Sequence, residues 1–133
     1  MTHYLLDTNH ASALFKKLPM LRQKLKAAPS ASYSLCRPSI GELWFMVFNS
    51  AQLQRNVADL DELMDEFACA EFDHAASVEF GRIKTELRKA GTSVQDVDVQ
   101  IAAIARSTGM TLLTSNRHFN SVSLLTVEDW LKP

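Results

Sequence analysis

Short apolar segments of strand length alternate along this chain with longer segments that have the apolar spacing of helices. The strand-like segments are residues 4–6, 32–36, 69–72 and 110–113, with a further weak one at 124–126. Helical patterns separate the first four from one another. Strands joined through helices pair in parallel, and a parallel sheet is covered by helices on both faces. We therefore expect an α/β fold of three layers (α/β/α), with a small, mainly parallel sheet of four to five strands.

The helical patterns have recognisable ends. Asp73 precedes apolar residues at helical spacing and Gly91 follows them, so we expect Asp73 to cap that helix and Gly91 to end it. A helix from about residue 96 to residue 107 has Gly109 just beyond its end. Further helices are predicted at residues 10–18, 19–28 and 39–49 and around residues 60–67.

Length and composition favour one soluble domain. The 133 residues suffice for a single core, and 47% hydrophobic with 22% charged residues is an ordinary globular balance. The longest apolar run, residues 43–48, is too short to cross a bilayer, and no signal peptide is recognisable. Cys36 and Cys69 lack the spacing of a zinc site, which favours reduced thiols. We expect one domain over residues 1–133, in the cytoplasm and without membrane association.

The net charge of −1 conceals two blocks of opposite sign. Residues 10–40 contain six Lys and Arg residues and no acid, whereas residues 56–73 contain seven Asp and Glu residues and no base. Solvated helix faces explain both blocks. A surface that faces phosphates is the alternative for the basic block.

Two polar segments directly follow predicted strands. Asp7 ends the first strand and Thr114-Ser115-Asn116 follows the strand at residues 110–113. Ligands of parallel sheets bind beyond the carboxyl ends of the strands, so these side chains are candidates for a site. Taken alone, Asp7 could instead cap the next helix, and Asn116 could be only a turn residue.

Three further acids remain ambiguous on spacing alone. Glu42 follows Ser39 at the spacing of a capping box, yet it also borders the apolar run at residues 43–48, where a carboxylate is costly unless a partner satisfies it. Asp96 and Asp98 both begin the helix that runs to residue 107, and we expect one of them to be its cap. Cap and ligand stay open for Glu42, as does the choice between Asp96 and Asp98.

Five short motifs follow one another along the chain: Y-L-L-D-T-N, S-I-G-E-L, F-G-R-I-K-T-E-L-R-K-A-G, D-V-Q-I-A-A-I-A and L-L-T-S-N-R-H-F. Each is weak alone, but the series resembles the PIN-domain ribonucleases, and most closely the VapC-type toxins of prokaryotic toxin–antitoxin pairs. The resemblance spans nearly the whole chain. It implies a PIN-like fold and a metal-dependent endoribonuclease that leaves a 5′-phosphate and a 3′-hydroxyl.

The resemblance also implies roles for individual residues. Asp7, Glu42 and Asp98 match the metal-binding, catalytic acids of the family, which favours Asp98 over Asp96. Three carboxylates in one crevice repel one another unless a cation is present. Oxygen ligands select hard ions such as Mg²⁺ or Mn²⁺. Such an ion can activate a water molecule for hydrolysis of an RNA phosphodiester bond.

Three other residues match supporting positions of the family. Asn9 and Thr114 correspond to residues that support the site by hydrogen bonding. Asn116 stands where many members have a fourth acid, so here that position is neutral and a second metal ion is in doubt. The sequence indicates no RNA-binding residues.

The helix predicted at residues 39–49 is apolar on every side. Ile40, Leu43, Trp44 and Val47 form one face, and Phe45, Met46 and Phe48 cover the others. Such a helix needs burial on more than one side. A central core helix explains the pattern. The alternative, which the resemblance suggests, is cover by a second subunit or by a small cognate antitoxin.

The partners implied are therefore an RNA substrate, an antitoxin and a second copy of the chain. A PIN-like module that binds RNA or protein without cutting is the competing functional hypothesis. The presence of all three acids favours the nuclease.

Overall fold

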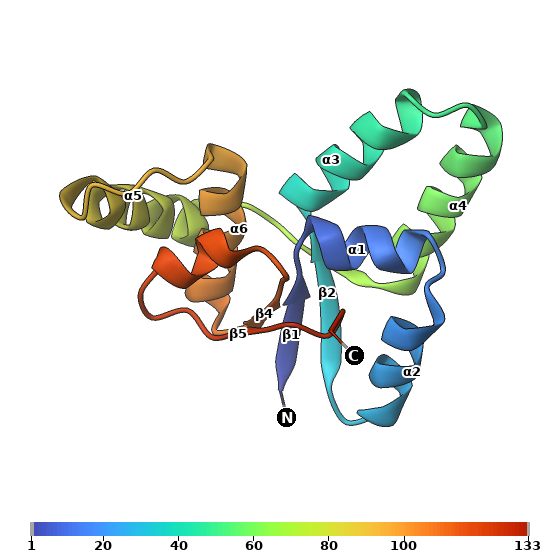
Figure 1. Ribbon diagram of the computed structural model, residues 1–133, viewed down its shortest axis with the longest axis horizontal. Helices are drawn as coiled ribbons and strands as arrows, with labels where there is room; N and C mark the ends of the chain where they lie inside the picture. Colours follow the sequence, from blue (N-terminus) through green and yellow to red (C-terminus); the bar gives the residue numbers. More distant parts are fainter. Residues whose placement is uncertain (1, 133) are drawn as a thin grey trace.

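Five parallel strands form one sheet in the computed structural model, which describes residues 2–132 (Figure 1). The strands are β1 (His3–Leu6), β2 (Ser32–Cys36), β3 (Ala68–Ala70), β4 (Thr111–Leu113) and β5 (Val127–Glu128). Their order is β3-β2-β1-β4-β5, so β1 lies in the centre between β2 and β4. The prediction of a small, mainly parallel sheet of four to five strands is confirmed.

Helices cover both faces of this sheet. They are α1 (Thr8–Phe15), α2 (Pro19–Ala27), α3 (Arg37–Phe48), α4 (Leu53–Glu66), α5 (His74–Lys89) and α6 (Asp96–Thr108), followed by a short 3₁₀ turn, η1 (Arg117–Ser121). Figure 1 shows α3 and α4 on the right and α5 and α6 on the left. None of the helices within residues 2–132 is long and apolar enough to span a membrane.

Alternate strand residues point into two separate cores. Leu5 packs into a core with residues of α5 and α6, whereas Leu6 packs into a core with residues of α1 to α4. Leu112 and Leu113 of β4 divide in the same way. Because side chains of a strand alternate between its two faces, this division gives the three layers that the sequence predicts.

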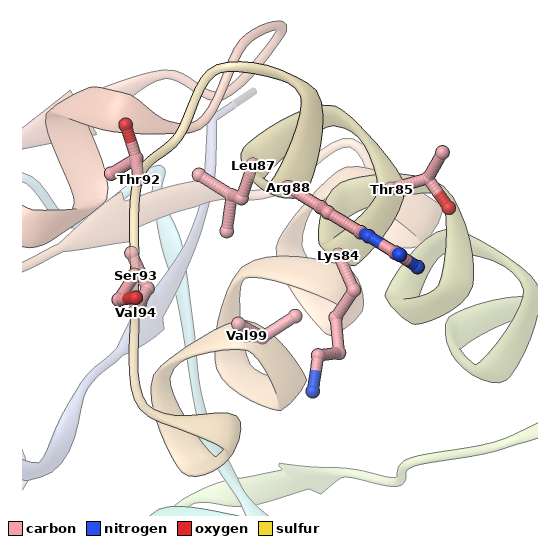
Figure 2. Close-up of a pocket in the computed structure, with 8 residues that line it drawn as sticks. All are labelled: Lys84, Thr85, Leu87, Arg88, Thr92, Ser93, Val94 and Val99. Carbon is pink, nitrogen blue, oxygen red and sulfur yellow. The ribbon is translucent and has the colours of Figure 1, made fainter.

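Local signals set several helix ends where the sequence predicts them. Asp73 accepts a hydrogen bond from the Ala76 amide at 3.0 Å and caps α5. Gly109 ends α6 with a left-handed φ of 73°, which glycine adopts without steric cost. Gly91, with φ 68°, follows α5. The segment that then leads to α6 contains Thr92, Ser93 and Val94 (Figure 2).

Two candidate caps do not form. Helix α3 begins at Arg37, two residues before Ser39, because Pro38 fits the first turn of a helix and does not stop the chain. Ser39 and Glu42 therefore form no capping box. Helix α6 begins after Gln95, and no side chain caps it, so neither Asp96 nor Asp98 has that role.

The strand predicted at residues 124–126 is displaced. Leu124 is 86% exposed and has a positive φ of 55°, which a strand does not allow. The fifth strand instead begins at Val127, where pairing with Leu112 of β4 sets its position. The third strand is also shorter than predicted, ending at Ala70.

The two charge blocks partly face each other. Arg22 of α2 pairs with Glu66 of α4, and Arg37 pairs with Glu71, while the Lys24 ammonium donates to the carbonyl of Trp130 at 3.1 Å. Exposed ion pairs of this kind contribute little stability. Together, the contacts of Arg22, Lys24 and Arg37 engage three of the six cations of the basic block with protein partners. This favours solvated helix faces over a surface for phosphates.

Candidate active site at the carboxyl edge of the sheet

Asp7 lies at the carboxyl end of the central strand β1. Its amide donates to the Leu113 carbonyl at 3.1 Å, so the ends of β1 and β4 are held together. One carboxylate oxygen accepts from the His10 amide at 3.0 Å and caps α1, and the other accepts from the Thr114 hydroxyl. The residue is 3% exposed. Asp7 is thus both the helix cap and a buried acid of the candidate site.

Glu42 approaches this edge from α3. The Thr8 hydroxyl lies within hydrogen-bond distance of a Glu42 carboxylate oxygen and, at 3.3 Å, of the Ser39 hydroxyl. Thr8 immediately follows Asp7, so Glu42 stands beside the first strand although it is 35 residues further along the chain. Glu42 remains exposed to solvent. Glu42, whose role the sequence spacing left open, therefore lies at the carboxyl edge of the sheet.

Asp98 comes from the first turn of α6 and is held by Asn116. The Asn116 side-chain amide donates to Asp98 at 3.3 Å, while its oxygen accepts from the His118 amide at 2.9 Å and caps η1. The Asn116 backbone amide donates to the Thr114 hydroxyl oxygen at 3.0 Å. A continuous chain of hydrogen bonds therefore connects Asp98 to Asp7 through Asn116 and Thr114.

The three acids interact electrostatically. Burial raises the pKa of Asp98, and the carboxylates of Glu42 and Asp7 raise it further, against the smaller opposing effects of His118 and Asn116. Within residues 2–132, no three His, Cys, Asp or Glu side chains are already arranged as a metal site. The donor set nevertheless fits a hard cation, because it consists of carboxylates whose repulsion such an ion would relieve.

The three residues expected to support the site differ in their contacts with the acids. Thr114 and Asn116 contact the acids directly. Asn9 is exposed in the first turn of α1, and among the described residues no hydrogen bond joins its side chain to the acids. The Thr8 hydroxyl instead contacts Glu42 and the Ser39 hydroxyl, both of α3. Short-range sequence signals could not reveal this, because the Thr8–Glu42 contact joins residues 34 positions apart.

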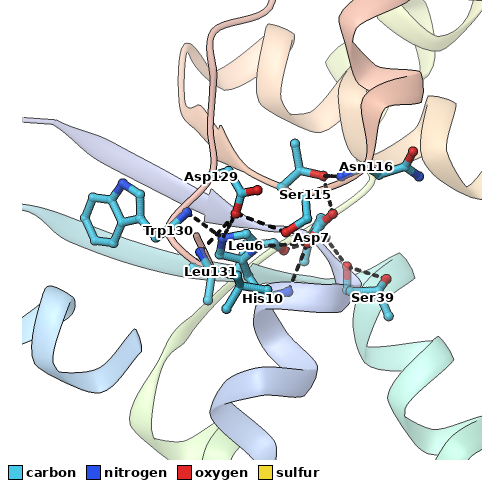
Figure 3. Close-up of polar contacts among 12 residues, drawn as sticks. Leu6, Asp7, His10, Ser39, Ser115, Asn116, Asp129, Trp130 and Leu131 are labelled. Carbon is cyan, nitrogen blue, oxygen red and sulfur yellow. Dashed lines mark hydrogen bonds and ion pairs between the residues drawn. The ribbon is translucent and has the colours of Figure 1, made fainter. Parts of the chain in front are cut away.

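A buried histidine ties the C-terminal segment to Asp7 (Figure 3). His10 is 0% exposed, and its Nδ1 lies 3.4 Å from the Asp7 carboxylate. Its Nε2 accepts from the Trp130 amide at 3.1 Å, so the proton of the neutral ring belongs on Nδ1, facing Asp7. Asp129 lies 3.7 Å from the same Nε2 and accepts from the Ser115 hydroxyl at 3.0 Å. Apart from the position of His10 one turn after Asp7, no sequence signal indicates this network.

The edge opens to solvent next to these residues. A hollow of about 460 Å³ is lined by Thr114 and Asn116, together with the cationic side chains of Arg117 and Lys132. The acids therefore lie beside a space that a larger molecule can enter.

Comparisons with known proteins agree with this architecture. A family model described as the PIN domain matches residues 4–125. The chain is 31% identical to Ribonuclease VapC2 of Haemophilus influenzae, over 98% of this chain and 100% of that protein. It is 29% identical to the tRNA(fMet)-specific endonuclease VapC of Shigella flexneri, over 98% of this chain and 99% of that protein.

Two solved structures show the same fold. The DNA-bound VapBC of Salmonella typhimurium matches with a TM-score of 0.90 and 28% identity, over 98% of this chain and 99% of that chain. VapBC2 of Rickettsia felis, bound to a DNA fragment from its promoter, matches with a TM-score of 0.90 and 24% identity, over 97% and 99%. With the family model and a relative above 30% identity both covering nearly the full chain, this protein belongs to the PIN-domain family and, within it, to the VapC ribonucleases.

Proposed function

We propose that this protein is a Mg²⁺- or Mn²⁺-dependent endoribonuclease that acts as the toxin of a type II toxin–antitoxin pair. The observation that carries the proposal is the gathering of Asp7, Glu42 and Asp98 from three separate elements at one edge, where burial and the two neighbouring carboxylates raise the pKa of Asp98. Its relatives of similar length are named ribonucleases and a tRNA endonuclease.

The chain's own residues would prepare the site for hydrolysis. Asp7 and Asp98 would hold the ion, and the exposed Glu42 would complete its ligands from the solvent side. Thr114 and Asn116 fix the orientation of the Asp7 and Asp98 carboxylates through their hydrogen bonds. A divalent ion bound there supplies a polarised water molecule and neutralises charge that develops on the phosphodiester.

Metal removal tests this proposal directly. RNA cleavage by the purified protein should stop in EDTA and return on addition of excess Mn²⁺ or Mg²⁺. Undiminished cleavage in EDTA would overturn the metal mechanism. RNA binding without cleavage under any metal condition would instead indicate the non-cutting PIN-like module.

The remaining expectations concern partners, localisation and domain organisation. We propose a small cognate antitoxin as partner, since the solved relatives are VapBC complexes, and a homodimer as the form in solution. Free thiols at Cys36 and Cys69 fit a reducing cytoplasm. Strands from residue 3 to residue 128 share one sheet, which supports a single domain over residues 1–133.

Asn116→Asp should tighten Mn²⁺ binding by about tenfold, because it adds a negative charge within several ångströms of the ion. Asparagine and aspartate are both good caps, so the bond to the His118 amide that starts η1 should survive. The new carboxylate would replace the amide that now donates to Asp98. Calorimetric titration of both proteins measures the difference. Equal affinity and stoichiometry would show that Asn116 is no part of the metal site.

A further inference from the structure

One ring nitrogen of the buried His10 has no hydrogen bond, although it lies beside Asp7 (Figure 3). The Nε2 atom accepts from the Trp130 amide at 3.1 Å. The Nδ1 atom finds no hydrogen-bond partner within residues 2–132, and the Asp7 carboxylate lies 3.4 Å from it. A buried polar group without a hydrogen bond destabilises a fold, so an unpaired Nδ1 calls for an explanation.

The contacts of the ring determine which nitrogen carries its proton. A backbone amide can only donate, so Nε2 must offer its lone pair to Trp130 and the single proton of the neutral ring is on Nδ1. Asp129 lies 3.7 Å from Nε2, but its oxygen accepts from the Leu131 amide at 2.9 Å. Asp129 thus shapes the turn that presents the Trp130 amide, and the His10 proton faces Asp7.

The Trp130 amide is itself held in place by the rest of the fold. The Trp130 ring packs against Tyr4 of β1 and Tyr33 of β2, with 4.7 and 5.9 Å between ring centroids. The Lys24 ammonium donates to the Trp130 carbonyl at 3.1 Å. Contacts on three elements therefore fix the position of this amide, and through it the orientation of the His10 ring.

The Asp7 carboxylate needs such fixed neighbours if it is to bind a metal ion. Its Oδ1 accepts from the His10 backbone amide, and its Oδ2 accepts from the Thr114 hydroxyl. The Nδ1 of His10 lies next to the same Oδ1. A distance of 3.4 Å exceeds that of a charge-assisted hydrogen bond, but contacts of this kind are often long in sites without their ligands and shorten when the site is loaded.

A purely structural role would use only one side of the His10 ring. A residue that served only to hold the C-terminal segment would need the acceptor at Nε2, and a glutamine side chain could supply it. The donor at Nδ1 adds nothing to that contact and leaves a buried polar group unpaired. Its position beside a candidate metal ligand favours a role at the site.

We propose that His10 is a positioning residue for the metal ion. Held by the Trp130 amide, it directs its Nδ1 proton to the Asp7 carboxylate and fixes the orientation in which Asp7 binds the ion. His10 touches neither the ion nor the RNA and acts through Asp7. The proposal rests on the proposed ribonuclease function and adds the C-terminal segment to the parts of the chain that shape its site.

Two substitutions separate the two nitrogens of His10. The amide nitrogen of an asparagine stands about where the histidine has Nδ1, so His10→Asn keeps a donor toward Asp7 and leaves the Trp130 amide without its acceptor. The amide oxygen of a glutamine stands about where the histidine has Nε2, so His10→Gln keeps the acceptor and removes the donor. Each variant thus retains one of the two contacts.

Calorimetric titration with Mn²⁺ and melting in EDTA measure the two roles independently. His10→Gln should bind Mn²⁺ about tenfold more weakly than the wild type, because hydrogen-bond partners of metal ligands typically have effects of this size. It should melt close to the wild-type temperature. His10→Asn should melt at a lower temperature, because the Trp130 amide loses its partner, yet its affinity for Mn²⁺ should stay within about threefold of the wild type. The Mn²⁺ concentration for half-maximal RNA cleavage should rise in His10→Gln by the same factor as the dissociation constant.

The ranking of the two variants decides the proposal. If His10→Asn loses as much Mn²⁺ affinity as His10→Gln or more, metal binding follows the stability of the fold and the positioning role is overturned. It is also overturned if both variants bind Mn²⁺ as the wild type does. In either case a wild-type protein that binds Mn²⁺ and cuts RNA leaves the ribonuclease function standing. A wild-type protein that binds no Mn²⁺ and cuts no RNA would overturn that function together with the role of His10.

Discussion

Asp98→Asn is expected to lower the rate of RNA cleavage by at least about a hundredfold. A bound divalent ion contributes several kcal/mol to transition states of this kind, and each 1.36 kcal/mol corresponds to about a tenfold change in rate. Asparagine keeps the shape of Asp98 but removes the charge that would hold the ion. The initial cleavage rate at saturating Mn²⁺ measures the effect. Cleavage at the wild-type rate would exclude Asp98 from the reaction.

The same change should stabilise the metal-free fold. Burial and the carboxylates of Glu42 and Asp7 raise the pKa of Asp98, so the folded protein holds this proton more tightly than the unfolded chain does. Ionisation of Asp98 at neutral pH therefore favours unfolding. In EDTA, Asp98→Asn should melt at a higher temperature than the wild type, which separates loss of activity from loss of structure.

Asp7 offers a matched pair of variants for the same purpose. Asparagine at this position can still accept from the His10 amide and cap α1, whereas alanine cannot. Both variants should be inactive, but only Asp7→Ala should lose about 1 kcal/mol of stability through the missing cap. If the Asp7→Asn variant cuts RNA at the wild-type rate, the role of Asp7 is limited to capping α1.

The parts of the fold that local signals determine could be predicted from the sequence. The second strand has the predicted bounds and ends just before the helix that Pro38 helps to start. Asp73 caps α5 through its side chain, and Gly109 ends α6 through its left-handed backbone. The fifth strand could not be placed in this way. An apolar Leu124 suggested a strand, but pairing with β4 decided its position and left Leu124 exposed.

The candidate site shows the same division. Its acids could be predicted because the motif series of the family marks them. The residues that hold these acids could not, since they depend on contacts between distant segments. Ser39 had the spacing of a capping box, yet the fold places it inside α3, near Thr8. In the sequence, His10 is indistinguishable from an ordinary helix residue. Only the return of the C-terminal segment gives its ring the Trp130 amide as a partner and fixes its proton toward Asp7.

Helix α3 presents an aromatic surface that its own chain leaves uncovered. Ile40, Leu43 and Val47 are buried, but Phe45 is 73% exposed and Phe48 is 65% exposed. The Phe48 ring stacks on Trp44 with 5.5 Å between ring centroids. The central-core explanation of this helix accounts for one of its faces only. The solved relatives are VapBC complexes, and we therefore propose that the cognate antitoxin covers Phe45 and Phe48.

The double variant Phe45→Ala/Phe48→Ala should weaken antitoxin binding by at least about a hundredfold. Buried aromatic anchors contribute roughly 2 kcal/mol or more each to such interfaces, and 1.4 kcal/mol corresponds to a tenfold change in affinity. Both rings are exposed and neither belongs to the candidate site, although Phe45 lies one turn beyond Glu42 on α3, so stability should change little and cleavage should persist. Leu124→Ser, at another exposed apolar residue, is the control. Calorimetry with the protein encoded beside the toxin measures affinity.

In cells, the wild type alone should arrest growth and the antitoxin should reverse the arrest, whereas the double variant should arrest growth even with the antitoxin present. Unchanged affinity of the double variant would place the antitoxin elsewhere and leave this surface for the second copy of the chain, which the molecular mass in solution at micromolar concentration would then reveal.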